Sequence, residues 1–208
     1  MSDTLASVTQ VLLYDNFTTL TALPTGQWGY NHWAAINNPS YYGRTQMEQY
    51  LPSVSNGALQ LTLQTYNPTG AGNSFLGSEI ISDQTFNDTA GGIAFTAVAK
   101  LDTTMPGMVG GIFAYNYNDS TGLDNESDFE SLTNDTTGQN NQEQTNVYSN
   151  QPLGAGNPEF VSIPGLNLTD YNTYTVEWFP TELLWFIDGQ RLPQMAPVLP
   201  HVVRRSVA

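Results

Sequence analysis

Short segments in which apolar and polar side chains alternate recur along the chain. They read GALQLTLQTY at 57–66, GGIAFTAVAKL at 91–101, TYTVEWF at 173–179 and LLWFIDG at 183–189. A period of two is typical of strands with one buried face, and no long amphipathic helix pattern is present. Gly, Pro, Asn and Asp lie between the segments as turn residues. The chain is therefore predicted to be all-β, an antiparallel two-sheet β-sandwich.

The length of 208 residues is most simply that of one domain, so residues 1–208 are predicted to form a single β-sandwich. The sequence has no cysteine, which excludes disulfide and thiol chemistry. No run of 18 apolar residues occurs, so no membrane span is predicted. The start MSDTLASVTQVLLYDNF lacks a basic leader with a long apolar core, so this chain is expected to carry no signal peptide.

The charge of the chain limits its partners. The formal net charge is -14, with only five Lys and Arg residues. A chain with so few cations has no basic patch to neutralise phosphates, which argues against nucleic acid and against an anionic membrane surface. An anionic polymer would be repelled as well. A neutral partner costs least in electrostatic free energy.

The stretch DNESDFES, residues 124–131, places Glu126, Asp128 and Glu130 at every second position. In a strand these three side chains point to one face, where like charges repel and are unattractive for stability alone. Glycoside hydrolysis needs one carboxylate and one carboxylic acid, and adjacent carboxylates push their pKa values apart. A solvated acidic loop is the alternative reading. A calcium-binding EF-hand fits worse, because Phe129 stands where glycine is needed and Asp135 where the bidentate Glu belongs.

The motif from Glu126 to Glu130 resembles the E-x-D-x-E signature of glycoside hydrolase family 16, a family of concanavalin A-like jelly rolls. The resemblance is to its lichenases and xyloglucan endotransglycosylases. Five further segments are similar to family segments and follow the family order: LLYDNF, NGALQLTL, GSEIISDQTF, FTAVAKLDTTMPGMVGGIFAYNY and TYTVEWFPTELLWFIDGQRLP. The segment QTNVYSN, residues 144–150, is similar to the one that follows the catalytic strand. The resemblance covers residues 12–193, and residues 194–208 form an atypical tail.

The resemblance implies a retaining endo-β-glucanase or transglycosylase. By position, Glu126 would be the nucleophile that forms a glycosyl-enzyme, and Glu130 the general acid and then the base. Asp128 would hydrogen-bond the nucleophile and modulate its charge. The spacing without an extra bulged residue resembles that of lichenases and xyloglucan-active enzymes, so a neutral β-1,3-1,4-glucan or a xyloglucan-like backbone is the expected substrate.

Four residues match cleft positions of the family and are predicted to bind substrate: Gln144, Asn146, Tyr148 and Trp178. The alternation also allows Trp178 to face inward with Val176 as a core residue. The chemistry requires no cofactor. A structural calcium ion is known in the family, but the sequence does not say whether this chain binds one, so the metal stays unknown. The resemblance implies a secreted protein, and the oligomeric state stays open.

Two departures from the family pattern bear on activity. Ser127 and Ser131 stand on the opposite face of the acidic strand, where the family usually has apolar residues. If that face is buried, each replacement loses burial of about 2 to 5 kcal/mol. The tail of residues 194–208 differs in composition from the rest of the chain, which leaves open a shortened sandwich. The alternatives are a carbohydrate-binding, lectin-like sandwich without turnover and a non-catalytic structural fragment.

Overall fold

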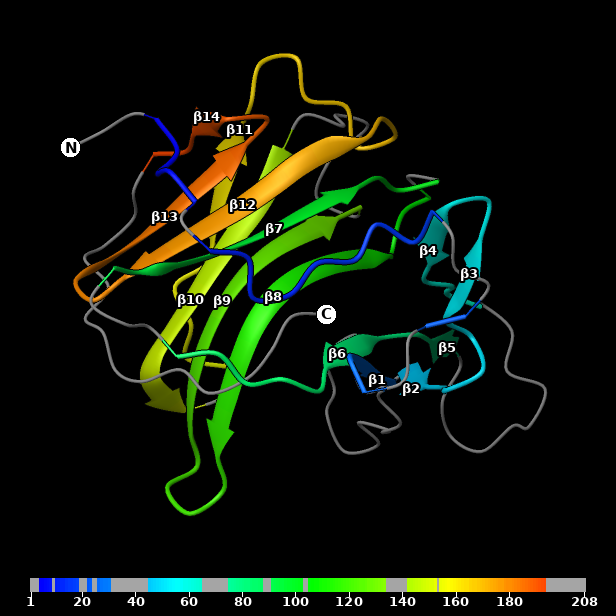
Figure 1. Cartoon of the computed structure of the whole chain (residues 1–208), viewed down its shortest axis with the longest axis horizontal. Helices are drawn as coiled ribbons and strands as arrows, with labels where there is room; N and C mark the ends of the chain where they lie inside the picture. The colour runs from blue at the N-terminus through cyan, green and yellow to red at the C-terminus, as the bar shows by residue number, and fades with distance from the viewer. Residues whose placement is uncertain are drawn as a thin grey trace. The chain divides into compact units, whose positions relative to one another are not determined.

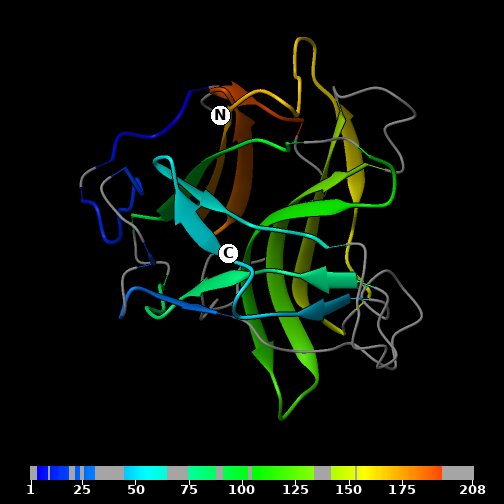
Figure 2. The same ribbon diagram turned by 90° about the vertical axis from the view of Figure 1, so that its right-hand side faces the viewer.

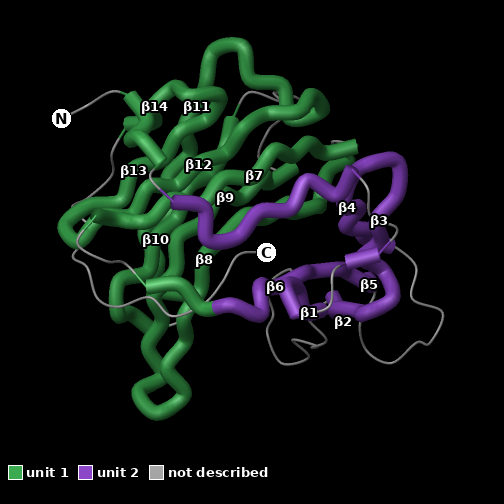
Figure 3. The backbone as a smooth tube through the Cα atoms, in the orientation of Figure 1, with its two compact units in different colours: residues 1–8, 85–207 green, residues 9–84, 208 purple. Residues whose placement is uncertain are grey.

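The computed structural model describes residues 4–8, 10–18, 22–23, 26–30, 45–64, 75–87, 91–102, 105–133, 142–152 and 154–193. The chain divides into two compact units, the first of residues 1–8 and 85–207 and the second of residues 9–84 and 208 (Figure 3). All regular secondary structure in the described ranges is β, which confirms the predicted class. No helix in this part of the chain is long and apolar enough to cross a membrane. The predicted tail, residues 194–208, lies outside the described residues.

The first unit contains two four-stranded antiparallel sheets (Figure 1). One sheet has the order β11-β10-β9-β8 and the other the order β14-β13-β12-β7. The strands are β7 Ile93–Ala99, β8 Val109–Asn118, β9 Leu123–Leu132, β10 Gln142–Pro152, β11 Glu159–Ser162, β12 Asn172–Phe179, β13 Glu182–Ile187 and β14 Gln190–Arg191. The alternating segments at 91–101, 173–179 and 183–189 thus provide strands, as predicted, and the structure places these strands in the second sheet.

Apolar side chains from both sheets form one core, which makes the first unit a sandwich. Phe129 and Val147 come from the first sheet, and Tyr174, Val176 and Trp178 from the second. The rings of Phe129 and Tyr174 meet edge to face, with centroids 5.3 Å apart and planes at 70°. Aromatic pairs favour this geometry because the positive ring edge meets the negative ring face. The two sheets are therefore joined by direct side-chain packing.

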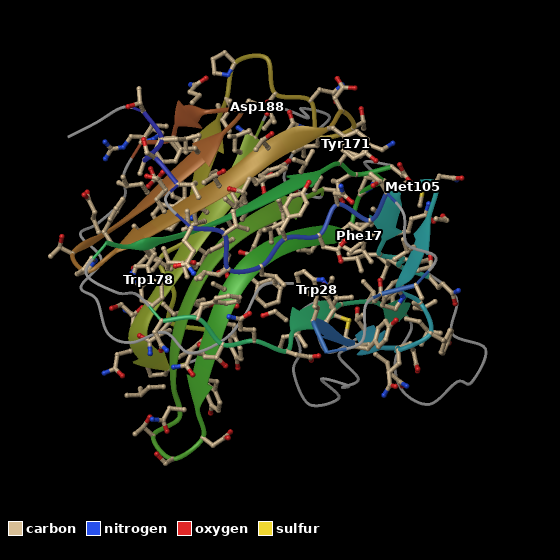
Figure 4. All side chains as sticks on the ribbon, in the orientation of Figure 1. Phe17, Trp28, Met105, Tyr171, Trp178 and Asp188 are labelled. Carbon is tan, nitrogen blue, oxygen red and sulfur yellow. The ribbon has the colours of Figure 1, made fainter. Side chains whose placement is uncertain are left out.

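Tight turns set the pairing of the strands. The β13–β14 hairpin turns at Asp188 and Gly189, both with positive φ (51° and 76°), which is the pattern that Asp-Gly turns supply. Asp188, labelled in Figure 4, also accepts a hydrogen bond from the N–H of Thr173 at 2.8 Å and so ties the hairpin to β12. The long β8–β9 hairpin, seen side-on in Figure 2, turns at residues 119–122, where the Oδ1 atom of Asn118 accepts from the N–H of Ser120 at 3.0 Å.

The core-facing side of β9 is buried, and the hydroxyl group of Ser131 in it has a hydrogen-bond partner. Ser127 and Ser131 are each 6% exposed. The Oγ atom of Ser131 donates to the carboxylate of Glu143, which is 1% exposed, at 2.9 Å to Oε2 and 3.1 Å to Oε1. A buried carboxyl group therefore occupies space that apolar side chains were expected to fill. The departure at Ser131 is compensated by a second polar residue rather than left as a void.

The second unit holds three short strand pairs. Its strands are β1 Trp28–Tyr30, β2 Thr45–Met47, β3 Ser53–Ser55, β4 Ala58–Gln60, β5 Phe75–Gly77 and β6 Ile80–Ser82. β1 pairs with β6 and β3 with β4 in antiparallel fashion, whereas β2 and β5 are parallel. Leu23, Val54 and Ile80 form its buried cluster. The segment predicted at 57–66 provides β4 and, at Gln64, an isolated bridge to Leu76.

Candidate active site

The predicted acidic row lies on one face of β9. Phe129, between the acids in sequence, points into the core at 1% exposure, so the acids point to the opposite face of the sheet. Glu126 and Glu130 are half-buried, whereas Asp128 is only 5% exposed. The stretch is therefore a strand that presents its carboxyl groups side by side, and the alternative of a solvated loop is wrong.

The neighbouring strands add polar and aromatic side chains to the same face. On β10, Gln144 pairs with Glu130, Asn146 with Asp128 and Tyr148 with Glu126. Residues that pair directly across two strands point to the same face. The structure thus brings three of the four predicted substrate-binding residues beside the three predicted catalytic residues, one opposite each acid.

β8 lines the other side of the acidic row. Phe113 pairs with Asp128 and Tyr115 with Glu126, and both aromatic side chains are half-buried. Sequence reasoning missed these two residues as members of the site. The alternation of FAYNY could have indicated them only if the pairing of β8 with β9 had been known, because that pairing decides which aromatic residue lies beside which acid.

Direct hydrogen bonds orient part of this face. The Nε2 atom of Gln144 donates to Oε2 of Glu130. The Oδ1 atom of Asn146 accepts from the N–H of Val147 at 2.9 Å. Gly156 packs against Asn146 and Tyr148 of β10. A Cβ atom at Gly156 would lie 2.5 Å from Oδ1 of Asn146 and 2.7 Å from Cζ of Tyr148. The segment after β10 therefore holds Asn146 and Tyr148 in place by a contact that only glycine permits.

The acids share their face with almost no positive charge. The described residues contain two cationic side chains, Lys100 directly after β7 and Arg191 in β14, which are strands of the other sheet. Lys100 pairs with Asp102 at 2.7 Å. Both described cationic side chains therefore belong to the sheet that does not carry the acids.

Burial and mutual repulsion raise the pKa values of Glu126 and Asp128. Burial is the main cause for Glu126, followed by the charge of Asp128. Burial also raises the pKa of Asp128 well above its usual range, and the charge of Glu130 adds to it. Interacting carboxyl groups lose their protons in separate steps, so the row can hold a neutral acid beside a charged carboxylate. General acid catalysis together with nucleophilic attack requires this combination.

Trp178 is the one predicted substrate-binding residue that the structure does not bring to this face. It lies on β12, labelled in Figure 4, and its side chain is 9% exposed within the core cluster that also contains Val176. Its placement is that of a packing residue between the sheets. The alternation alone left both orientations open, and the inward one is observed.

Asp124 is an additional carboxylate on the acidic face. It lies two residues before Glu126 on β9 and is completely buried. The sequence shows that Asp124 precedes Glu126 by two positions. The structure adds that β9 begins at Leu123, so Asp124 lies in the strand and on the same face as Glu126. Within the described residues no group of three or more His, Cys, Asp and Glu side chains has the arrangement to hold a metal ion.

Comparisons with known proteins agree with this architecture. The family model described as glycosyl hydrolases family 16 matches residues 41–197. Among proteins with a curated description, no sequence matched the chain. A β-1,3-1,4-glucanase (lichenase) derived from a mouse hindgut metagenome is similar in structure, with a TM-score of 0.73 and 18% identity over 93% of this chain and 82% of that chain.

Two further solved structures have the same fold. A β-glucanase from Bacillus licheniformis gives a TM-score of 0.66 at 22% identity and covers 96% of this chain and 85% of that one. The catalytic domain of an endo-1,3-β-glucanase (laminarinase) from Thermotoga petrophila gives 0.67 at 15% identity, over 95% and 86%. The family model spans most of the chain, and the fold, with carboxyl groups on one sheet face, agrees with it. The chain therefore belongs to glycosyl hydrolase family 16 and is a glycoside hydrolase built as an antiparallel β-sandwich.

Proposed function

We propose that the protein is a retaining endo-β-glucanase or transglycosylase that acts on a neutral glucan. The observation that carries this proposal is the pairing register of three strands, which sets Glu126, Asp128 and Glu130 side by side and places Glu126 between Tyr115 and Tyr148. A row of acids with flanking aromatic and amide side chains suits a sugar chain, because aromatic faces stack on sugar rings and amides bond to hydroxyl groups.

In the first step Glu126 attacks the anomeric carbon of the bound sugar. A bond forms between its carboxylate oxygen and that carbon, and the bond to the leaving glycosidic oxygen breaks. Glu130 gives its proton to that oxygen, which leaves as a hydroxyl group. Asp128 lies buried between the two. It shares a hydrogen bond with Glu126 and so modulates the charge of the nucleophile.

In the second step Glu130 acts as the base. It removes a proton from water, or from the hydroxyl group of an acceptor sugar, which then attacks the anomeric carbon and releases Glu126. The hydrogen bond from Nε2 of Gln144 to Oε2 of Glu130 fixes the position of this carboxyl group. Two displacements at one carbon return the original anomeric configuration.

The substrate is proposed to be a mixed-linkage β-1,3-1,4-glucan or a xyloglucan-like polymer. The unbulged spacing from Glu126 to Glu130 supports this choice, since β9 pairs with both neighbours without interruption across the three acids. A neutral polymer also avoids repulsion by a protein whose net charge is -14. Secretion, which the family resemblance implies, would bring the enzyme to such a polymer.

The test is release of reducing ends from mixed-linkage glucan, xyloglucan and laminarin by the purified chain. Glu126→Gln should lower the rate by roughly a thousandfold or more, because the amide cannot form the glycosyl-enzyme. Glu159→Gln is the matched control, since Glu159 is exposed on β11 outside the acidic row, and its rate should stay unchanged. Nuclear magnetic resonance (NMR) of the first products should show the β-anomer. Equal rates for wild type and Glu126→Gln would reject the mechanism, and binding without any release would indicate the lectin-like alternative.

A further inference from the structure

Phe160 is an exposed aromatic side chain on the sheet that carries the acids. It lies in the short strand β11, which pairs with β10 and stands at the edge of this sheet among the described strands. Its side chain is 48% exposed, whereas the next residue, Val161, is 6% exposed and belongs to the core. Successive side chains of a strand point to opposite faces. Phe160 therefore points to the acidic face.

The strand register connects Phe160 to the proposed acid/base residue. Phe160 pairs with Gln144, and Gln144 in turn pairs with Glu130. The hydrogen bond from Gln144 to Glu130 already joins two members of this row across the sheet. Neighbouring strands are about 4.8 Å apart, which places the backbone of Phe160 roughly 10 Å from that of Glu130. This distance is comparable with the length of a disaccharide.

A sugar chain has to cross β9 rather than run along it. A glycosidase places its two carboxyl groups on either side of the bond that it breaks, so that bond lies between Glu126 and Glu130. These two residues follow one another along β9. A chain that passes between them therefore crosses the strand, and in one direction it leads over β10 toward β11. Phe160 lies at that end with its ring exposed.

The surroundings of Phe160 suit a sugar ring. Two positions further along β11, Ser162 pairs with Gln142 on the same face, and Nε2 of Gln142 donates to Oγ of Ser162 at 3.0 Å. An aromatic ring bordered by amide and hydroxyl groups matches a sugar, because the ring packs on the apolar C–H face and the polar groups bond to the sugar hydroxyl groups. None of these side chains is charged, which suits a neutral polymer.

We propose that Phe160 is a substrate-binding residue: its ring stacks on a sugar unit that lies beyond Gln144, away from the bond that is broken. The proposal rests on the proposed function, because it takes a glucan chain as the ligand of the acidic face. Phe160 lies away from the reacting atoms, so it strengthens the binding of long chains and leaves the chemical step unchanged. It thereby favours long chains over short ones.

Isothermal titration calorimetry in the Glu126→Gln background measures this contribution without turnover by the proposed nucleophile. The ligands are mixed-linkage glucan, xyloglucan and laminarin, each as a long and a short oligosaccharide fraction. Adding Phe160→Ala should weaken binding of the long fraction by roughly tenfold and leave the short fraction unchanged. Phe160→Trp keeps an aromatic face and should retain the affinity. Tyr171→Ala is the matched control, since Tyr171 is 60% exposed directly before β12 of the other sheet and should not alter binding.

Equal affinities for the long fraction with and without Phe160→Ala would overturn the role of Phe160 and leave the proposed function intact. Failure of every glucan to bind to Glu126→Gln would overturn both. In the active protein, Phe160→Ala should raise KM for long mixed-linkage glucan by a similar factor and change kcat by less than about twofold. The melting temperature should stay that of wild type, because the side chain is exposed. A lower kcat at unchanged KM would contradict the stacking role.

Discussion

Replacing the buried Glu143 by Gln should remove a large part of the pH dependence of stability. Burial raises the pKa of Glu143 from 4.5 to about 8, with Ser131 opposing the rise and the charge of Glu130 adding to it. The folded protein thus holds a proton that the unfolded chain releases. Stability from this group is complete below the unfolded pKa of 4.5 and is lost as the pH rises toward 8.

The size of the effect follows from the shift. A rise from 4.5 to about 8 is about 3.5 pH units, and each unit corresponds to about 1.36 kcal/mol. Wild type should therefore lose about 5 kcal/mol of unfolding free energy through Glu143 between pH 4.5 and pH 8. The amide of Gln keeps an acceptor for Ser131 and carries no charge, so Glu143→Gln should match wild type at low pH and be the more stable protein at pH 8 and above.

Urea unfolding followed by tryptophan fluorescence at fixed ionic strength, from pH 5 to pH 9, measures this difference. The two unfolding free energies should diverge steadily with rising pH. General repulsion from the net charge of -14 affects both proteins and cancels in the comparison. Glu159→Gln, at an exposed position, should run parallel to wild type. Parallel curves for wild type and Glu143→Gln would refute the argument that a protonated carboxyl group lies in the core.

Three further substitutions probe packing and the site. Phe129→Ala removes the ring that joins the two sheets and should lower the unfolding free energy by about 3 to 5 kcal/mol, measured in urea; a loss under 1 kcal/mol would contradict the core assignment. Gly156→Ala should raise KM with little change in melting temperature, since the new methyl group displaces Asn146, whereas Gly91→Ala has open space and should leave KM unaltered. Gln144→Ala should lower kcat/KM about tenfold by removing a hydrogen-bond donor to Glu130, the proposed acid/base, and an unchanged value would mean that this hydrogen bond does not orient Glu130.

The alternation within single strands made much of the site predictable. Glu126, Asp128 and Glu130 follow the period of two and were expected to share a face, whereas Gln144, Asn146 and Tyr148 were predicted from the family resemblance. The pairing that joins the two sets depends on contacts between strands, and the motif resemblance supplied that link rather than any local pattern. Phe113 and Tyr115 had no such support and were missed for this reason.

The buried polar core could not be read from the sequence. Ser131 and Glu143 lie 12 positions apart in the sequence, on β9 and β10, and neither residue alone suggests an interior location. The replacement of an expected apolar residue by Ser131 was visible, but its partner was not. Glu143 also lies next to Gln144 in sequence and yet on the opposite face, so only the strand register separates the core acid from the acidic row.

The acidic row also protects the fold against misalignment of its own strands. A slip of β9 by one residue would turn Glu126, Asp128 and Glu130 toward the tryptophans and aliphatic side chains between the sheets and would expose Phe129 to water. Three carboxyl groups cannot enter such a space cheaply, so wrong alignments of this hairpin are strongly disfavoured. The proposed catalytic residues would then also set the alignment of their own strand, and neutralising them would lower the fidelity of folding as well as the catalytic rate.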